Sequence, residues 1–135
     1  TPNGAILEGM HFLCAEDNEL NAEILTELLK IKGAECTICE NGEKVVKTFE
    51  QSVPGTYDMI LMDVQMPIMN GYDAARAIRR SLHKQAGTIP IIAMTANAFS
   101  EDIRHSLTAG MNAHITKPIG TIIESNQTME ECLCR

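Results

Sequence analysis

The most constraining feature of this sequence is a short apolar run that ends in a single carboxylate. Residues 60–62 are all apolar, which is typical of a strand covered on both faces. Pro67 and Gly71 follow closely and prevent the strand from continuing in either regular structure. Such a strand belongs in a parallel sheet with helices on both sides, so the run predicts an α/β protein with Asp63 at the carboxyl end of a strand.

Strands and helices are predicted to alternate along the rest of the chain. Apolar runs indicate the other strands at residues 10–15, 34–40, 89–94 and 112–116. Helical spacing or capping residues indicate helices that begin near Asn18, Gly42, Tyr72 and Ser100. This alternation implies parallel βαβ units with right-handed crossovers. We therefore predict a flavodoxin-like three-layer α/β/α sandwich with a five-stranded parallel sheet of order 2-1-3-4-5.

Two of these helices carry more detailed predictions. In the first, apolar residues recur at helical spacing until Gly33 ends the helix, namely at Leu20, Ile24, Leu28 and Ile31. In the third, one face is predicted to point inward and consists of Ala74, Ala75, Ile78 and Leu82. The opposite face is interpreted as a solvated surface and consists of Arg76, Arg79 and Arg80.

The length of 135 residues is that of one domain. We expect a tail or linker at residues 1–8 and a single domain over residues 9–133. A closing helix is predicted from about Ile119, where apolar residues lie at suitable positions, although Gly120 and the polar run 125–128 weaken it. The first residue is Thr1 and not Met, which indicates a piece of a longer protein, although a processed chain would look the same.

Charge and hydropathy argue against several kinds of partner. The formal net charge is -7 and the chain has no long block of Lys or Arg, so direct binding to nucleic acid or to an anionic membrane is not expected. No apolar run approaches the roughly 20 residues that span a bilayer, and the first residues do not resemble a signal peptide. We expect a soluble, cytoplasmic domain.

The five cysteines are interpreted as thiols in a reducing compartment. Cys36 and Cys39 have the spacing of a zinc-binding pair, but residues three apart on a strand point to opposite faces. No second pair of Cys or His follows at a suitable spacing, so a zinc site is not predicted.

Polar side chains follow four of the five predicted strands, and all of these strand ends lie at the same edge of the sheet. They are Glu16, Asp17, Asp63, Thr95 and Lys117. Carboxylates that share a crevice repel one another and therefore favour a shared proton or a divalent cation, and Mg²⁺ prefers such oxygen ligands. Mg²⁺ also favours phosphate oxygens as ligands. The positive charge of Lys117 and the hydroxyl of Thr95 could bind the other oxygens of the same phosphoryl group. The set predicts phosphoryl transfer onto Asp63.

Each of these residues also has an ordinary structural interpretation. An acidic pair before a helix stabilises the helix dipole, and Asp63 could be a turn residue. Thr95 could cap a helix, and Lys117 could be a surface charge. Their joint occurrence at four strand ends is what these separate interpretations do not explain.

The chain resembles the receiver domains of two-component response regulators from about Met10 to Ile119. Motifs match in order and spacing at Glu16-Asp17-Asn18, Asp63 to Gly71, Met94 to Ala98 and Lys117-Pro118-Ile119. The resemblance implies that Asp63 takes a phosphoryl group from a phosphohistidine. The implied partner is a histidine kinase or a histidine phosphotransfer domain, and a receiver homodimer is a further alternative.

The same resemblance assigns roles to further positions. Glu16, Asp17 and Asp63 would hold Mg²⁺ together with the backbone carbonyl of Gln65. Thr95 and Lys117 would bind the phosphoryl oxygens, and Ala96 would leave room for the group to enter. Thr95 and His114 would form the conformational switch, with His114 in a position that is usually aromatic; an imidazole there could make switching weaker or sensitive to pH.

The wording of the motifs is most similar to receivers of hybrid sensor histidine kinases, and a stand-alone regulator is the alternative. An aspartyl phosphatase similar to haloacid dehalogenases would need an acid two residues after its nucleophile, where this chain has Gln65. A flavodoxin-like cofactor binder would not suit Glu16 and Asp17, which repel phosphate. A receiver that has lost phosphorylation and only binds proteins is opposed by Asp63, Thr95 and Lys117.

Overall fold

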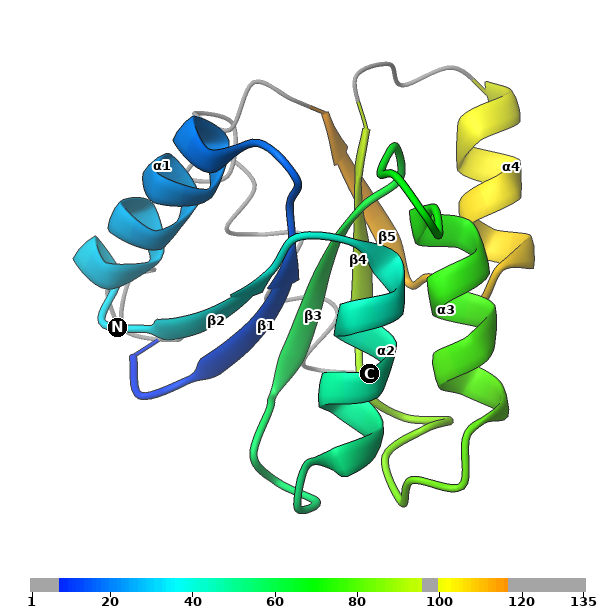
Figure 1. Cartoon of the computed structure of the whole chain (residues 1–135), viewed down its shortest axis with the longest axis horizontal. Helices are drawn as coiled ribbons and strands as arrows, with labels where there is room; N and C mark the ends of the chain where they lie inside the picture. Colours follow the sequence, from blue (N-terminus) through cyan, green and yellow to red (C-terminus); the bar gives the residue numbers. More distant parts are fainter. Residues whose placement is uncertain (1–7, 96–99, 117–135) are drawn as a thin grey trace.

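A computed structural model of the chain describes residues 8–95 and 100–116. Its elements in chain order are β1 (His11–Ala15), α1 (Glu19–Ile31), β2 (Glu35–Cys39), α2 (Gly42–Gln51), β3 (Met59–Asp63), α3 (Gly71–Arg80), β4 (Ile91–Thr95), α4 (Ser100–Thr108) and β5 (Ala113–Thr116). The strands form one parallel sheet of order β2-β1-β3-β4-β5, which confirms the predicted fold (Figure 1). The predicted closing helix and residues 1–7 of the predicted tail lie outside the described residues.

Asparagine side chains start three of the helices at the carboxyl edge of the sheet. Asn18, Asn41 and Asn70 each accept a hydrogen bond at 2.9 Å from the backbone N–H three residues later. An N-cap of this kind satisfies a backbone donor that has no partner inside the helix. The N-termini of α1, α2 and α3 therefore follow directly from the sequence, and all lie at the upper edge of the sheet in Figure 1.

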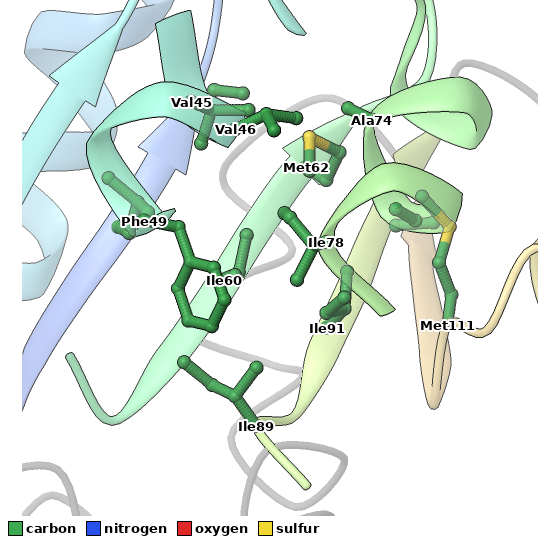
Figure 2. Close-up of a cluster of buried hydrophobic side chains, with 14 of the residues drawn as sticks. Val45, Val46, Phe49, Ile60, Met62, Ala74, Ile78, Ile89, Ile91 and Met111 are labelled. Atoms are coloured by element: carbon green, nitrogen blue, oxygen red, sulfur yellow. The ribbon is translucent and has the colours of Figure 1, made fainter. Parts of the chain in front are cut away.

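Two apolar clusters hold the layers together, one on each face of the sheet. The first joins the sheet to α2 and α3, and Figure 2 shows side chains such as Phe49 and Ile78 packed against Ile60 and Ile91. The second packs α1 against the opposite face. Every residue of β3 and β4 is buried, which confirms that the central strands are covered on both sides.

The apolar residues of α1 do not all face the sheet. Leu25 and Leu29 are buried, whereas Leu20, Ile24 and Ile31 are 64, 40 and 74% exposed. The helical spacing was correct, but α1 carries two apolar stripes and only one of them packs on β1 and β2. The second stripe leaves a large apolar surface in solvent.

The predicted faces of α3 need two corrections. Leu82 was predicted to point inward but is fully exposed, because α3 ends at Arg80 and the helical spacing stops there. Arg79 was predicted to be part of a solvated face but is partly buried. It donates hydrogen bonds to the carbonyls of Gly110 and Ala86 and to Oδ1 of Asn112, at 2.9, 3.0 and 2.9 Å.

The described cysteines are free thiols that belong to both faces of the sheet. Cys14 and Cys36 pack in or against the cluster under α1, whereas Cys39 packs in the cluster under α2 and α3. Burial raises the pKa of the Cys14 thiol well above its usual range, so this thiol is protonated at neutral pH. Among the described residues, no helix combines the length and hydropathy needed to cross a membrane.

Candidate functional site

Three carboxylates meet at the carboxyl edge of the sheet, where β1 and β3 lie side by side. Ala15 of β1 pairs with Met62 of β3, so Glu16 and Asp63 follow at the same level on neighbouring strands. Asp17 comes next in the chain. Oxygen atoms of the three side chains lie within 4.8 Å of one another. The structure thus brings together the acidic residues that the sequence placed on two separate strand ends.

Burial makes this cluster electrostatically unusual. Glu16 is 2% exposed and Asp63 is 4% exposed, while Asp17 is on the surface. Like charges repel more strongly when they are removed from water, so a cation that bridges the oxygens would stabilise the cluster. Carboxylate oxygens at this spacing, with one side open to water, fit the preferences of Mg²⁺. Glu16, Asp17 and Asp63 are therefore the residues that can hold this metal.

Backbone hydrogen bonds fix the two buried carboxylates. The N–H of Gln65 donates to Oδ1 of Asp63 at 3.1 Å. The N–H of Asn18 donates to Oε2 of Glu16 at 3.3 Å, and the N–H of Glu16 donates to the carbonyl of Cys39 at 3.0 Å. Each acid is thereby held by the backbone of the turn that follows its strand.

Thr95 and His114 take their places from the register of the other two strands. Asp63 pairs with Met94, so Thr95 lies one residue farther along the neighbouring strand, where it is 2% exposed. His114 pairs with Ala93 and is partly buried. Lys117 and Ala96, which were predicted to complete the site, lie outside the described residues. The roles of all of these residues stay predictions.

Gly71 is a part of the site for which the sequence analysis gave no role beyond chain breaking and membership of the Asp63 to Gly71 motif. A Cβ at this position would lie 2.3 Å from the carbonyl oxygen of Asp63 and 2.8 Å from Cα of Val64. Its N–H donates to the carbonyl of Val64 at 3.1 Å. Gly71 therefore lets the start of α3 pack directly on the backbone of the acidic residue. A glycine eight residues after the carboxylate was the available signal.

The doubly wound sheet and the acidic cluster at its carboxyl edge define a flavodoxin-like domain with a candidate metal site. Residues 12–124 match the response regulator receiver domain family, and the chain belongs to that family. Probable histidine kinase 2 of Oryza sativa subsp. indica is 39% identical over 124 residues, which cover 84% of this chain and 12% of that protein. The chain thus spans about an eighth of the length of this relative.

Solved structures agree with this assignment. The receiver domain of sensor histidine kinase PA1611 from Pseudomonas aeruginosa PAO1 is 33% identical with a TM-score of 0.81, covers 94% of this chain and is itself 99% covered. That structure holds a magnesium ion in its active site cleft. The Saccharomyces cerevisiae complex of the phosphotransfer protein Ypd1 with the receiver domain of Ssk1 matches with 30% identity, a TM-score of 0.79 and coverages of 93% and 89%.

Proposed function

We propose that this domain accepts a phosphoryl group on Asp63, with Mg²⁺ held by Glu16, Asp17 and Asp63. The observation that carries the proposal is the cluster of three carboxylates, two of them buried, at the carboxyl edge of a receiver-family sheet. The magnesium ion in the related PA1611 receiver supports the same metal here. The backbone carbonyl of Gln65 is proposed as a further ligand.

The proposed reaction forms one bond and breaks one bond. A carboxylate oxygen of Asp63 attacks the phosphorus of a phosphohistidine, and the phosphorus–nitrogen bond breaks. The electron pair returns to the imidazole nitrogen of the donor, which takes up a proton, and Asp63 becomes an acyl phosphate. Bound Mg²⁺ would supply positive charge to offset the repulsion between the carboxylates and the incoming phosphoryl group. Thr95 and Lys117 are proposed to bind phosphoryl oxygens, with Ala96 leaving space for entry.

Intact-mass measurement tests this function. After incubation with Mg²⁺ and acetyl phosphate, the protein is expected to gain the mass of one phosphoryl group, and excess chelator is expected to prevent the gain. The modification should be lost on mild alkaline treatment, because acyl phosphates hydrolyse readily. A protein that stays unmodified under these conditions would contradict the proposal.

Mg²⁺ binding can be tested without any phosphoryl donor. Mg²⁺ at 100 times its dissociation constant should stabilise the wild-type protein by about 2.7 kcal/mol, seen as a rise in Tm. Asp17→Asn removes an exposed member of the cluster, so it should reduce this rise strongly while leaving the metal-free protein folded. Glu19→Gln, a change in the first turn of α1 outside the cluster, is the control and should retain the rise. If Mg²⁺ raises the Tm of both variants equally, Asp17 does not hold the metal.

The parent protein is proposed to be a hybrid sensor histidine kinase, with this domain over residues 9–133. The chain covers only 12% and 6% of two histidine kinase relatives, which supports this arrangement. A stand-alone regulator is the alternative. In either case Thr95 and His114 are proposed to change position on phosphorylation.

The exposed stripe of α1 is proposed as the docking surface for the donor protein. α1 begins two residues after Asp17, so its first turn, which carries the exposed Leu20, follows the acidic site directly. A groove of about 930 Å³ runs along this part of α1 and is lined by Leu20, Ile24, Ile38 and the acids Glu19, Glu23 and Glu27. Apolar residues with an acidic rim suit a helix of a histidine phosphotransfer domain that carries apolar and basic side chains. The Ypd1–Ssk1 complex shows that a related receiver binds such a protein.

Replacement of Leu20 by Ser should separate docking from chemistry. We expect transfer from a phosphorylated phosphotransfer domain to slow about tenfold or more, since a buried Leu contributes about 1.5 to 3 kcal/mol. The rate with acetyl phosphate should not change, because that donor needs no protein surface. Ile31→Ser, at the far end of the same helix, is the control and should retain both rates. If Leu20→Ser changes neither rate, or if it instead dissociates a homodimer, the donor docks elsewhere.

A further inference from the structure

The loop between β3 and α3, residues 64–70, contains a strained backbone turn next to the acidic site. Ile68 has a φ of 71°, and the N–H of Met69 donates to the carbonyl of Pro67 at 2.7 Å. This is a γ-turn with positive φ at its central residue, which is rare and unfavourable, above all for a β-branched side chain. The side chain of Ile68 is 77% exposed, so its burial does not offset the cost of this backbone conformation. Other contacts must therefore hold the loop in this form.

Backbone contacts at both ends of the loop provide part of that restraint. At the start, the N–H of Gln65 donates to the carboxylate of Asp63. At the end, Asn70 caps α3, and the N–H of Gly71 donates to the carbonyl of Val64. Within the turn, the Met69–Pro67 hydrogen bond and the packing of the Met66 and Met69 side chains against the apolar cluster under α2 and α3 add to these contacts.

A further backbone restraint comes from a different part of the chain, the turn between β2 and α2. The N–H of Gly42, the first residue of α2, donates to the carbonyl of Met69 at 3.2 Å. A Cβ at Gly42 would lie 2.3 Å from that carbonyl oxygen and 2.9 Å from its carbon. Gly42 does not have a positive φ, so glycine is required here by the closeness of the loop and not by the conformation of its own backbone.

We infer that Gly42 is a positioning residue for the phosphoacceptor site, acting through the carbonyl of Met69 on the loop that follows Asp63. This inference rests on the proposed function and adds β2, the strand end to which the sequence assigned no site residue. Met69 is four residues from Gln65, whose N–H contacts Asp63 and whose carbonyl is a proposed metal ligand. A displaced Met69 would strain the short connection and move Gln65, which weakens metal binding and slows phosphorylation.

Gly42→Ala tests the inference against Gly87→Ala, a matched control whose added Cβ meets no atom within 4 Å. We expect the Mg²⁺ dissociation constant of Gly42→Ala, measured by calorimetric titration, to rise about tenfold, whereas Gly87→Ala keeps the wild-type value. Amide resonances of Gln65 and Met69 should shift in the metal-free Gly42→Ala protein. Adding Ile68→Gly should restore part of the affinity, because a glycine at the turn can absorb the displacement before it reaches Gln65. A folded Gly42→Ala protein with wild-type Mg²⁺ affinity overturns the inference.

Amide exchange in the wild-type protein decides the question if Gly42→Ala does not fold. The Gly42 amide is expected to exchange more slowly when Mg²⁺ is bound, since a metal that fixes the loop also fixes the Met69 carbonyl. An exchange rate that Mg²⁺ leaves unchanged overturns the inference. Neither measurement needs a phosphoryl donor, so failure here is distinct from failure of wild-type phosphorylation, which would count against the proposed function itself.

Discussion

Asp63→Asn is expected to abolish phosphorylation by acetyl phosphate completely. The amide has nearly the same shape as the carboxylate but is a far weaker nucleophile and a poorer ligand for Mg²⁺. Intact-mass measurement should show no added phosphoryl group under conditions that fully modify the wild-type protein. Asp73→Asn, which changes an exposed acid on α3, is the control and should be modified normally.

The same substitution should have the opposite effect on stability in the absence of metal. Oxygens of Asp63, Glu16 and Asp17 lie within 4.8 Å of one another, and two of these residues are buried. Removing one charge relieves repulsion on the order of 1 to 3 kcal/mol, so Tm in chelator should rise above that of the wild-type protein. Mg²⁺ should raise the Tm of Asp63→Asn much less than that of the wild type. Retained phosphorylation, or a metal-free Tm below that of the wild type, would show that Asp63 is not the centre of the acidic cluster.

Local patterns were sufficient to predict the sheet and the position of the acids. The run at residues 60–62 requires cover on both faces, and the structure buries all of β3. Asn18 and Asn41 are residues that favour the N-cap position, and each caps the helix that follows it. Because parallel strands end at one edge, Glu16 and Asp63 had to lie together once the strand order was known. Lys117 belongs to the same prediction but lies outside the described residues.

Features that depend on contacts between distant segments were not predictable in this way. α1 has two apolar stripes, and the sequence alone does not say that Leu25 faces the sheet while Ile24 does not. Gly42 reads as an ordinary turn residue, because its contact with Met69 joins two segments far apart in the chain. Arg79 reads as a surface charge, because its acceptors are 7 to 33 residues away. Tertiary contacts set the role of each of these side chains.

Arg79→Ala should produce the largest loss of stability among changes to charged residues of α3. It removes donors to the carbonyls of Gly110 and Ala86 and to Asn112, whose Oδ1 also accepts from the N–H of Ile91. Partly buried acceptors that lose their donor cost about 1 to 3 kcal/mol each, so we expect a loss of roughly 3 kcal/mol in the free energy of unfolding. Denaturant unfolding monitored by circular dichroism measures this loss.

Matched arginine variants separate the tertiary contacts of Arg79 from its charge. Arg80→Ala removes an exposed side chain with one 3.3 Å bond to the carbonyl of Arg76, and should cost less than about 0.5 kcal/mol. Arg79→Lys keeps the charge but cannot span three acceptors, so it should recover only a minor part of the loss. The Mg²⁺ affinity should stay at the wild-type value in all three variants, since these contacts lie at the amino ends of β4 and β5, away from Asp63. Equal stabilities of Arg79→Ala and Arg80→Ala would mean that Arg79 does not tie α3 to the segments before β4 and β5.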